Sequence, residues 1–227
     1  MLATGVVGAV EDPWIRWSWI SGHVDVIAAA LVQHIQLTLI AVVLGLVIAI
    51  PLGLVAWRSR FFRGPIFTLT GILYTIPSLA LFAFLLPFTG LTVLTAEIGL
   101  VGYTLLILIR NIVVGLNAVP DDVREAARGM GFRPLAELAR IDLPLAIPGI
   151  IAGVRIATVT TIGLVTVTAL IGEGGLGSLI YDGLLHDFHT PLVVGTVLSV
   201  ALAFAADLSL AGLQRLVTPW ARSRAVS

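Results

Sequence analysis

Hydrophobic residues gather along this chain in runs that are long enough to cross a bilayer. A membrane-spanning helix needs about 20 apolar residues, because a rise of ~1.5 Å per residue must cover ~30 Å of hydrocarbon. Five runs meet this requirement, over residues 37–57, 65–87, 98–116, 145–171 and 191–213. Pro51, Pro77 and Pro148 lie inside them, which bilayer helices tolerate where neighbouring groups satisfy the freed backbone. The pattern predicts an all-α, polytopic membrane protein with five transmembrane helices.

Residues 24–36, just before the first run, are apolar but repeatedly interrupted by polar side chains. The interrupting residues are Asp25, Gln33, His34 and Gln36. This pattern predicts an amphipathic helix that lies on the membrane surface before the first span. Trp14, Trp17 and Trp19 are expected to anchor that segment at the interface.

Arginine placement predicts the orientation of the spans. One side receives ten arginines, in the segments after the first, third and fifth runs: Arg58, Arg60, Arg63, Arg124, Arg128, Arg133, Arg140, Arg215, Arg222 and Arg224. The opposite segments hold one arginine and seven carboxylates: Arg16, Glu11, Asp12, Asp25, Glu97, Glu173, Asp182 and Asp187. The positive-inside rule makes the arginine-rich side cytoplasmic. We therefore expect an external N-terminus and a cytoplasmic C-terminus.

Composition agrees with a membrane protein and excludes several other classes. The chain of 227 residues is 58% hydrophobic and 11% charged, whereas a soluble domain has about 25% charged residues. A net charge of zero gives no reason to expect nucleic-acid binding. Cysteine is absent, no nucleophile–base constellation stands out, and the histidines lack metal-ligand spacing: His23, His34, His186 and His189. We expect these histidines near surfaces, no bound metal, and no enzyme activity.

The segment between the third and fourth runs begins with a short helix. Asp122 and Glu125 resemble a capping box, with both carboxylates at the positive end of the helix. Gly129 and Gly131 are suited to end it in left-handed geometry, and Gly131 is expected to have a positive φ.

A second short helix is predicted to follow. Pro134 suits its first turn, and Leu143 followed by Pro144 is expected to end it before the fourth span. The segment would then be two short helices lying on the cytoplasmic face, with the small side chains of Ala126 and Ala127 leaving a low surface for another protein.

The same segment resembles the signature loop of ABC-importer permeases. That loop has Glu-Ala-Ala, three residues, Gly, nine residues and Ile-x-Leu-Pro. Every spacing is met here, by Glu125, Ala126, Ala127, Gly131, Ile141, Leu143 and Pro144. The resemblance implies a coupling helix that docks on an ATP-binding subunit and turns closure of that subunit into movement of the spans. The alternative is an ordinary interfacial amphipathic loop.

The chain has no lysine, and a Walker A phosphate loop requires one. An ATPase site of this kind is therefore excluded, and the energy must come from a separate subunit. The resemblance assigns ATP and magnesium to a pair of ATP-binding subunits and no cofactor to this chain. It also implies a second permease, identical or paralogous, and an extracytoplasmic substrate-binding protein.

Further stretches resemble the permeases of glycine betaine/carnitine/choline importers. They are residues 34–38, 51–53, 108–111, 153–155 and 169–177, and the similarity covers about 34–213. Glu173 stands where this resemblance predicts a small residue. The implied solute is a small osmoprotectant (glycine betaine, choline, carnitine or a proline-like compound). A permease for another solute such as methionine, or an uncoupled channel or scaffold, are the alternatives.

These patterns divide the chain into three parts. Residues 1–33 are expected to be external or interfacial, 34–213 to be the permease domain, and 214–227 to be a cytoplasmic tail. The expected location is the cytoplasmic (inner) membrane of a bacterial-type cell.

Three charged residues fall inside the predicted spans. Arg155 and Asp207 lie at depths that differ by about one helical turn, and Arg110 lies near the end of the third span. Charges in spans usually face protein or water. They are interpreted either as a cluster that gates or lines a path, or as a structural pair that locks two helices together.

Aromatic residues in the spans are candidates for contact with a quaternary ammonium group, which aromatic rings hold by cation–π interaction. Tyr74 and Tyr103 are the main candidates, with Phe82 and Phe84 beside them. The alternative is that they pack against other helices or face lipid.

Overall fold

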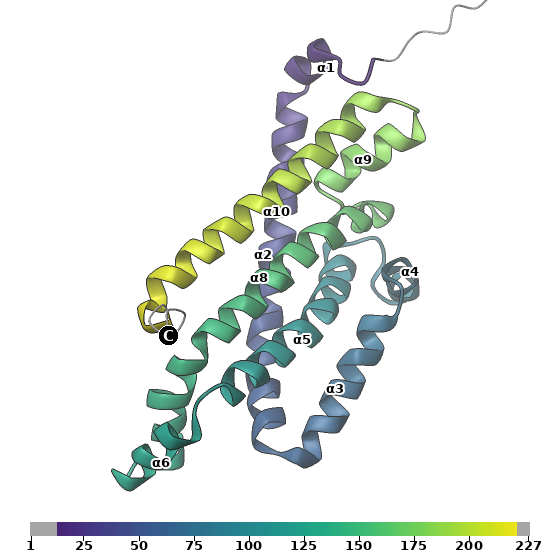
Figure 1. The fold of residues 1–227 in the computed structure, drawn as a ribbon. Coiled ribbons are helices and arrows are strands. Elements are labelled where there is room, and N and C mark those ends of the chain that lie inside the picture. The colour runs from purple at the N-terminus through teal and green to yellow at the C-terminus, as the bar shows by residue number, and fades with distance from the viewer. Residues whose placement is uncertain (1–12, 222–227) are drawn as a thin grey trace, which may run out of the picture.

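The computed structural model describes residues 13–221, and within that range it contains helices and no strands (Figure 1). The α-helices are α1 (Trp17–Gly22), α2 (Val24–Arg58), α3 (Arg60–Thr75), α4 (Ser78–Thr89), α5 (Val93–Asn117), α6 (Asp121–Gly129), α7 (Pro134–Glu137), α8 (Leu143–Val167), α9 (Leu176–Leu185) and α10 (His189–Val217). A π-helical turn (Leu138–Asp142) joins α7 to α8, and 3-10 turns lie at Thr168–Ile171 and Pro219–Ala221. The predicted all-α class is confirmed.

Among residues 13–221, four helical segments are long and apolar enough to cross a membrane. They are Val24–Arg58, Val93–Asn117, Pro134–Ile171 and His189–Val217. The pair α3 and α4 adds a fifth if the two are counted as one broken span. The predicted orientation stays a prediction. Residues 1–12, which include Glu11 and Asp12, and residues 222–227, which include Arg222 and Arg224, lie outside the described range.

The prediction of a separate surface helix over residues 24–36 is wrong, because α2 runs without interruption for 35 residues. Two of the four polar side chains that suggested an interface have partners within the protein. Gln33 donates from Nε2 to Glu173 at 2.9 Å, and His34 Nε2 donates to the carbonyl oxygen of Ile162 at 3.0 Å. The boundary expected between residues 33 and 34 therefore falls inside α2.

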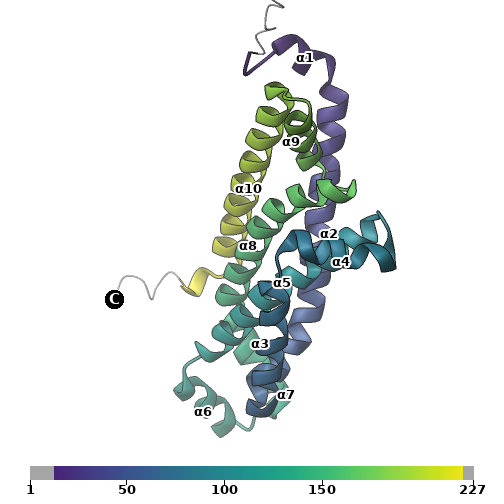
Figure 2. The ribbon, with the colours of Figure 1, turned by 90° about the vertical axis from the view of Figure 1, so that its right-hand side faces the viewer.

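The second predicted span, residues 65–87, is not a straight helix. Its two halves, α3 and α4, meet at an angle of 95°, and Figure 2 shows α4 extending sideways from the bundle. The bend lies at Pro77, because a residue before proline is driven out of helical geometry, and Ile76 is extended (φ −64°, ψ 127°). The Tyr103 hydroxyl on α5 donates a hydrogen bond to the Ile76 carbonyl that the bend exposes.

Helix α5 is the centre of the bundle, with α2 on one side and α8 on another. A Cβ atom on Gly53 of α2 would lie 2.7 Å from Cγ2 of Ile112 in α5. The contact with α8 is between backbones, because a Cβ on Gly149 would lie 2.7 Å from the Cα of Gly115 in α5. Small residues at such crossings let helix backbones approach closely, which is the main source of helix association in a bilayer.

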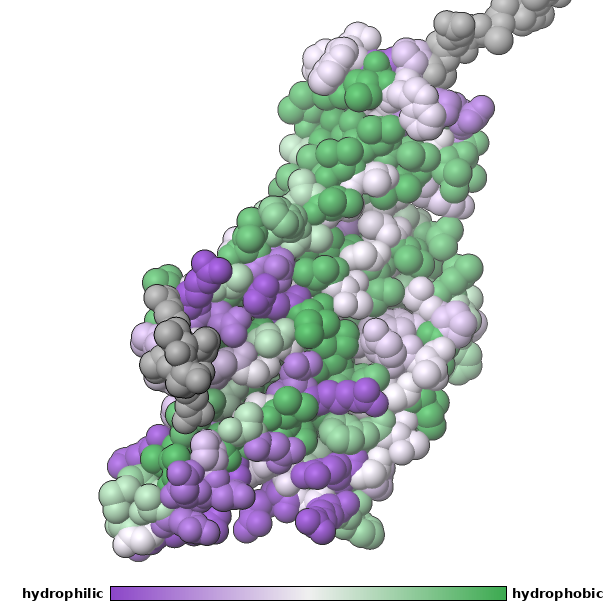
Figure 3. Space-filling view, viewed as in Figure 1, coloured by the Kyte–Doolittle hydropathy of each residue, from purple (hydrophilic) through white to green (hydrophobic). Residues whose placement is uncertain are grey.

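The arginine-rich turn between α2 and α3 lies at the same end of the molecule as α6 and α7 (Figures 1 and 2). Hydrophilic residues gather at this end, whereas hydrophobic residues cover much of the face above it (Figure 3). We call it the arginine-rich end, defined by the α2–α3 turn and α6–α7. The opposite end carries α1 and the turn between α9 and α10.

The backbone contact between α5 and α8 generates a stability prediction. In Gly149→Ala, the added methyl group meets backbone rather than a movable side chain, so we expect a loss of about 1–3 kcal/mol in the free energy of unfolding. Gly163→Ala, on the same helix with nothing within 4 Å of its Cβ position, is the matched control and should not lose stability. Thermal unfolding of the purified protein in detergent measures both. Equal midpoints for the two variants would contradict the close α5–α8 contact.

Candidate functional site

The first helix of the signature loop begins at Asp121, one residue before the predicted start. The predicted capping box is wrong, because the N-cap residue is Pro120 and no side chain caps the helix. Asp122 instead accepts a hydrogen bond at Oδ1 from the backbone N–H of Val123 at 2.9 Å, and Glu125 is exposed. Asp121 and Asp122 still place two carboxylates in the first turn, where the helix dipole favours negative charge.

The end of α6 is built as the sequence predicts for Gly131. This residue has φ +82°, and the α-helix ends at Gly129. The backbone N–H of Gly131 donates to Arg128 O at 2.9 Å, and that of Phe132 donates to Ala127 O at 3.1 Å. This pair of bonds is a Schellman motif, whose left-handed residue is normally glycine.

Two arginines of α6 hold the following helix by its carboxylates. Arg124 Nε donates to Asp142 Oδ1 at 2.8 Å, and Arg128 Nη2 donates to Glu137 Oε1 at 3.0 Å. Both residues that supply the carboxylates are buried (Asp142 2% and Glu137 7% exposed), so the carboxylate of each pair is largely shielded from water. The hydrogen bond from Arg128 to Glu137 raises the pKa of the Arg128 guanidinium above its ordinary value.

The π-helical turn explains why these two pairs form together. Arg124 and Arg128 lie four residues apart, which places them on one face of α6. Glu137 and Asp142 lie five residues apart, a spacing that shares a face where the backbone hydrogen bonds run from i to i+5, as in the turn at 138–142. The spacing of the two arginines is visible in the sequence, but no sequence pattern predicted the π-turn.

The second predicted short helix does not end before the fourth span. Helix α7 starts at Pro134 as predicted, but it continues through the π-turn into α8, so Pro134–Ile171 is one helical segment. Pro144 occupies the first turn of α8 instead of stopping the chain. A proline lacks an N–H and crowds the carbonyl four residues earlier; the wider π-turn just before it accommodates both effects.

Arg124 also ties the loop to the spans. Its Nη2 donates to the Leu116 carbonyl of α5 at 2.6 Å, and its guanidinium carbon lies 5.4 Å from the ring centroid of Trp57 on α2. A single side chain thus connects α6 with α2, α5 and, through Asp142, the start of the α8 segment.

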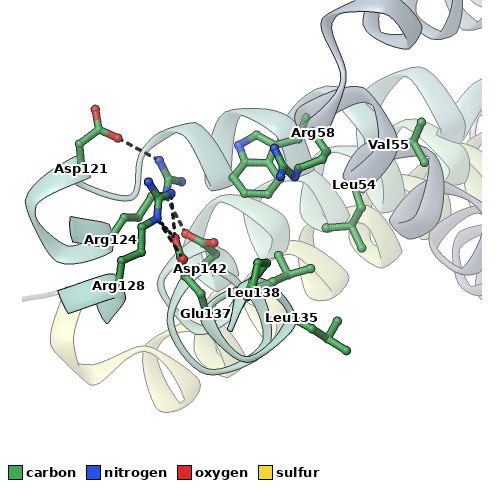
Figure 4. A pocket seen from close by; sticks show the side chains of 12 residues that line it. Leu54, Val55, Arg58, Asp121, Arg124, Arg128, Leu135, Glu137, Leu138 and Asp142 are labelled. Atoms are coloured by element: carbon green, nitrogen blue, oxygen red, sulfur yellow. Dashed lines mark hydrogen bonds and ion pairs between the residues drawn. The ribbon is translucent and has the colours of Figure 1, made fainter. Parts of the chain in front are cut away.

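A cleft of about 820 Å³ opens between the end of α2 and the loop, at the arginine-rich end (Figure 4). Arg124 and Arg128 lie side by side on one wall with Glu137 and Asp142 facing them, and Leu54 and Val55 of α2 lie on the other side.

The seven signature residues divide into exposed and supporting positions. Glu125, Ala126 and Gly131 are exposed, Ala127 is buried, and the remaining three are half-buried, namely Ile141, Leu143 and Pro144. Two large apolar side chains stand beside the exposed set, Met130 (69% exposed) and Leu135 (77%). The loop therefore presents a small, partly apolar surface on a framework fixed by two arginine–carboxylate pairs.

Within the spans, the structure pairs Arg155 of α8 with Asp207 of α10. Arg155 donates from Nε to Oδ1 at 2.8 Å and from Nη2 to Oδ2 at 2.9 Å, and from Nη1 to Gln214 Oε1 at 3.3 Å. Both paired side chains are about one-third exposed (30% and 36%). Arg110 is exposed on α5 and, among residues 13–221, has no hydrogen bond or ion pair with either partner, so the three charges do not form one cluster.

The candidate aromatic residues do not form a cage. Tyr74 and Tyr103 meet edge to face with ring centroids 6.0 Å apart. Phe82 is buried in the core at 1% exposure, whereas Phe84 is 67% exposed and packs against Phe88. The packing interpretation accounts for all of these contacts.

Two buried polar residues, one on α2 and one on α5, were not identified from the sequence. His34 was expected near a surface but is fully buried, and Glu97 lies inside α5 at 7% exposure rather than in the preceding loop. Among the described residues, His34 Nδ1 and both carboxylate oxygens of Glu97 are buried without a hydrogen-bond partner. Their burial depends on contacts between helices that a single sequence does not display.

Residues 27–219 match the protein family described as binding-protein-dependent transport system inner membrane component. The chain belongs to this family. It is therefore the permease component of an ABC importer, a multi-pass protein of the cytoplasmic membrane, and relatives of this kind are transport subunits rather than enzymes.

Curated relatives and a solved structure agree with the assignment. The permease is 37% identical over 188 residues to the choline transport system permease protein OpuBB of Bacillus subtilis, covering 82% of this chain and 86% of that one. It is 35% identical over 198 residues to the osmoprotectant import permease protein OsmW of Salmonella typhimurium, covering 85% and 92%. Its fold is similar to that of the MetNI methionine ABC transporter in an inward-facing conformation, with a TM-score of 0.75, 24% identity, and coverage of 82% and 93%.

Arg124 binds one buried and one exposed carboxylate, so removal of each can be compared in the same protein. Asp142→Ala leaves the Arg124 guanidinium, 12% exposed, without its buried partner, and we expect a loss of about 3–5 kcal/mol in the free energy of unfolding. Asp121→Ala removes the exposed partner (91% exposed, 3.2 Å from the same arginine) and should cost only about 0–1 kcal/mol. Thermal unfolding in detergent compares the two variants. Similar losses would show that burial of Asp142 is not what makes the pair matter.

The pair within the spans is tested by a double-mutant cycle. Asp207→Ala strands the Arg155 charge, so this variant should unfold at a lower temperature than the double variant Arg155→Ala/Asp207→Ala, which removes both charges. Losses that simply add would mean that the two side chains do not interact in the folded permease.

Proposed function

We propose that this permease imports a small osmoprotectant of the glycine betaine, choline or carnitine class across the cytoplasmic membrane. Support comes from its relatives at 35–37% identity, which are permeases of a choline transport system and of an osmoprotectant import system. The residue stretches that resemble this class extend through most of the chain. Uptake of labelled choline and glycine betaine by cells that carry the whole transporter, compared with cells that lack this permease, tests the proposal directly.

The energy for transport would come from a separate pair of ATP-binding subunits that dock on the loop formed by α6 and α7. The observation that carries this proposal is the geometry of the loop: the seven signature residues are mounted on two arginine–carboxylate pairs, and Met130 and Leu135 are exposed beside them. Exposed apolar side chains on a fixed framework suit insertion into a groove of another protein. The arginine-rich end would then be cytoplasmic, as the positive-inside rule predicts.

The other partners follow from the family. A binding-protein-dependent system uses an external binding protein, which would deliver the solute to the end that carries α1 and the α9–α10 turn. Four to five spans are few to enclose a gated path, so we propose that two permeases, identical or paralogous, form it together.

Two alternatives receive less support. Import of methionine would rest on similarity to the MetNI transporter, but a likeness at 24% identity concerns the fold alone. An uncoupled channel or scaffold would have no use for a rigid loop that carries the complete signature.

Substitution of Gly131 tests the coupling role of the loop. Gly131→Asp and Gly131→Asn have nearly the same shape and both tolerate a positive φ, and no atom lies within 4 Å of the Cβ position. They differ in one charge. We expect both variants to reach normal membrane abundance, and Gly131→Asp to lose uptake by about tenfold or more, because it places an unpaired charge in the docking surface.

Three measurements are needed for each variant: solute uptake, membrane abundance, and co-purification with the ATP-binding subunit. Gly131→Asn should retain more uptake and more of the partner than Gly131→Asp. Full uptake by Gly131→Asp would remove the loop from the coupling mechanism.

A further inference from the structure

Arg110 is a charged residue inside a span that the described part of the chain leaves without a partner. It lies on α5, seven residues before the helix ends at Asn117, which is ~10 Å along the helix axis. The residue is exposed, and over residues 13–221 no hydrogen bond or ion pair involves its side chain. An arginine at this depth is costly against lipid, so charges in spans face protein or water.

The packing of α5 against α8 places this arginine at the depth of the ion pair in the spans. A Cβ on Gly149 of α8 would meet Gly115 of α5. One turn further along α8, a Cβ on Gly153 would lie 2.4 Å from the Cβ of Asn111, one turn back along α5. The two helices are therefore antiparallel, and Arg155 stands level with the residue just before the arginine.

Arg110, Arg155 and Asp207 thus form one layer of the bundle, with two positive charges and one negative charge. Arg155 and Asp207 bind each other and are still 30% and 36% exposed. Each oxygen of a carboxylate can accept two hydrogen bonds, and each oxygen of Asp207 accepts one from Arg155. The exposed side of Asp207 can therefore accept a second arginine.

The exposed side of this layer on α5 lies away from α2. Leu108 and Ile112 lie two residues before and after Arg110, and they contact α2 at Gly45 and Gly53. Two residues turn an α-helix by about 200°, so Arg110 points to the side of α5 that is opposite α2.

Helix α8 presents its exposed side in the same direction. Val154 and Thr158 line an apolar groove whose other walls are α2 and α10. Ile156, midway between them in sequence, is 51% exposed and faces away from α2. In Figures 1 and 2, α5, α8 and α10 all lie on one side of α2. Figure 3 shows their outer face, where hydrophilic residues interrupt the hydrophobic surface well above the arginine-rich end.

The charge of Arg110 calls for a carboxylate at its own depth. Lipid phosphates lie outside the hydrocarbon, and Glu97 on the same helix is too deeply buried (7% exposed) to meet a partner. Asp207 is accessible at the right depth, but within one copy it lies on α10, on the other side of α8 from α5.

We propose that the face formed by α5, α8 and α10 packs against a second copy of this permease, and that Arg110 of each copy contacts Asp207 of the other. The inference rests on the proposed function, in which two permeases form the path together. Two copies in one membrane orientation are related by a twofold axis along the membrane normal, so equivalent residues keep the same depth. With the axis beside α8, α5 of one copy faces α10 of the other, and the contact forms twice.

Chemical cross-linking tests the contact, because the chain has no cysteine and every introduced thiol is unique. Two differently tagged copies are expressed with the ATP-binding subunits, one with Arg110→Cys and one with Leu208→Cys. Leu208 is 55% exposed beside Asp207, and its substitution leaves the ion pair with Arg155 in place. A short bis-methanethiosulfonate reagent is used, since an arginine–carboxylate contact holds the backbones too far apart for a disulfide. We expect a product that carries both tags.

Val47→Cys combined with Leu208→Cys is the matched control. Val47 is 63% exposed, lies within about one turn of the same depth, and points away from α5 because it follows Gly45 by two residues. This pair should give no product above background.

A second measurement tests the charge. Arg110→Glu sets two carboxylates against each other, so co-purification of two tagged copies should fall by about tenfold, whereas Arg110→Lys should keep most of it. Membrane abundance should stay normal for both variants, because Arg110 has no partner in its own described chain.

No product from the Arg110→Cys and Leu208→Cys pair, a product from the Val47→Cys pair, or unchanged co-purification of Arg110→Glu would each overturn the inference. So would failure of two wild-type copies to co-purify from the assembled transporter. None of these results touches the proposed solute, because uptake of choline and glycine betaine by the wild type tests it separately. Absence of that uptake would refute the osmoprotectant proposal and leave a specific cross-link standing.

Discussion

The close contact of α5 with its neighbours is the constraint on which the rest of the permease depends. A bilayer offers no hydrophobic gain for bringing two helices together, so the contacts must come from packing at short range. Glycines at Gly53, Gly115 and Gly149 let the backbones approach, and larger side chains such as Ile112 fill the space. The loop inherits its position from this arrangement, because Arg124 binds the last turn of α5 through Leu116.

Arginine does two different jobs in the structure. At the arginine-rich end, Arg124 and Arg128 use several N–H donors each to join α6 to α5, α7 and the π-turn, which lysine, with a single ammonium, does less well. Within the spans, Arg155 forms a two-point contact with Asp207 that satisfies both charges where water is scarce. The absence of lysine from the chain is consistent with this reliance on planar, multi-donor contacts.

Much of the fold was predictable because span length is a strong constraint, and Gly131 was predictable because its turn needs a positive φ. The effect of each proline was not. Pro51 and Pro148 remain inside helices, whereas Pro77 bends the chain by 95°. The difference lies in tertiary contacts, because at the bend the Tyr103 hydroxyl donates a hydrogen bond to the carbonyl of Ile76, the residue before Pro77.

The buried state of His34 and the pairing of Arg124 with Asp142 were hidden for the same reason. Each depends on a partner more than 15 residues away, which is Ile162 for His34 and Asp142, the last residue of the π-turn, for Arg124. Sequence spacing also suggested that Arg110 might join Arg155 and Asp207, but depth in the membrane does not specify which face of a helix a residue occupies.

The segment Pro134–Ile171 has a mechanical consequence. Its helical hydrogen bonding continues for 38 residues, about 57 Å at the α-helical rise, from the signature loop to the glycine-rich turn at residues 172–175. When a continuous helix tilts about a fixed point, its two ends move in opposite directions. The close crossing with α5 at Gly149 supplies that fixed point. A force applied at the loop then reaches the turn that holds Glu173 against α2 through one continuous helical segment, which works as a lever with its short arm at the arginine-rich end.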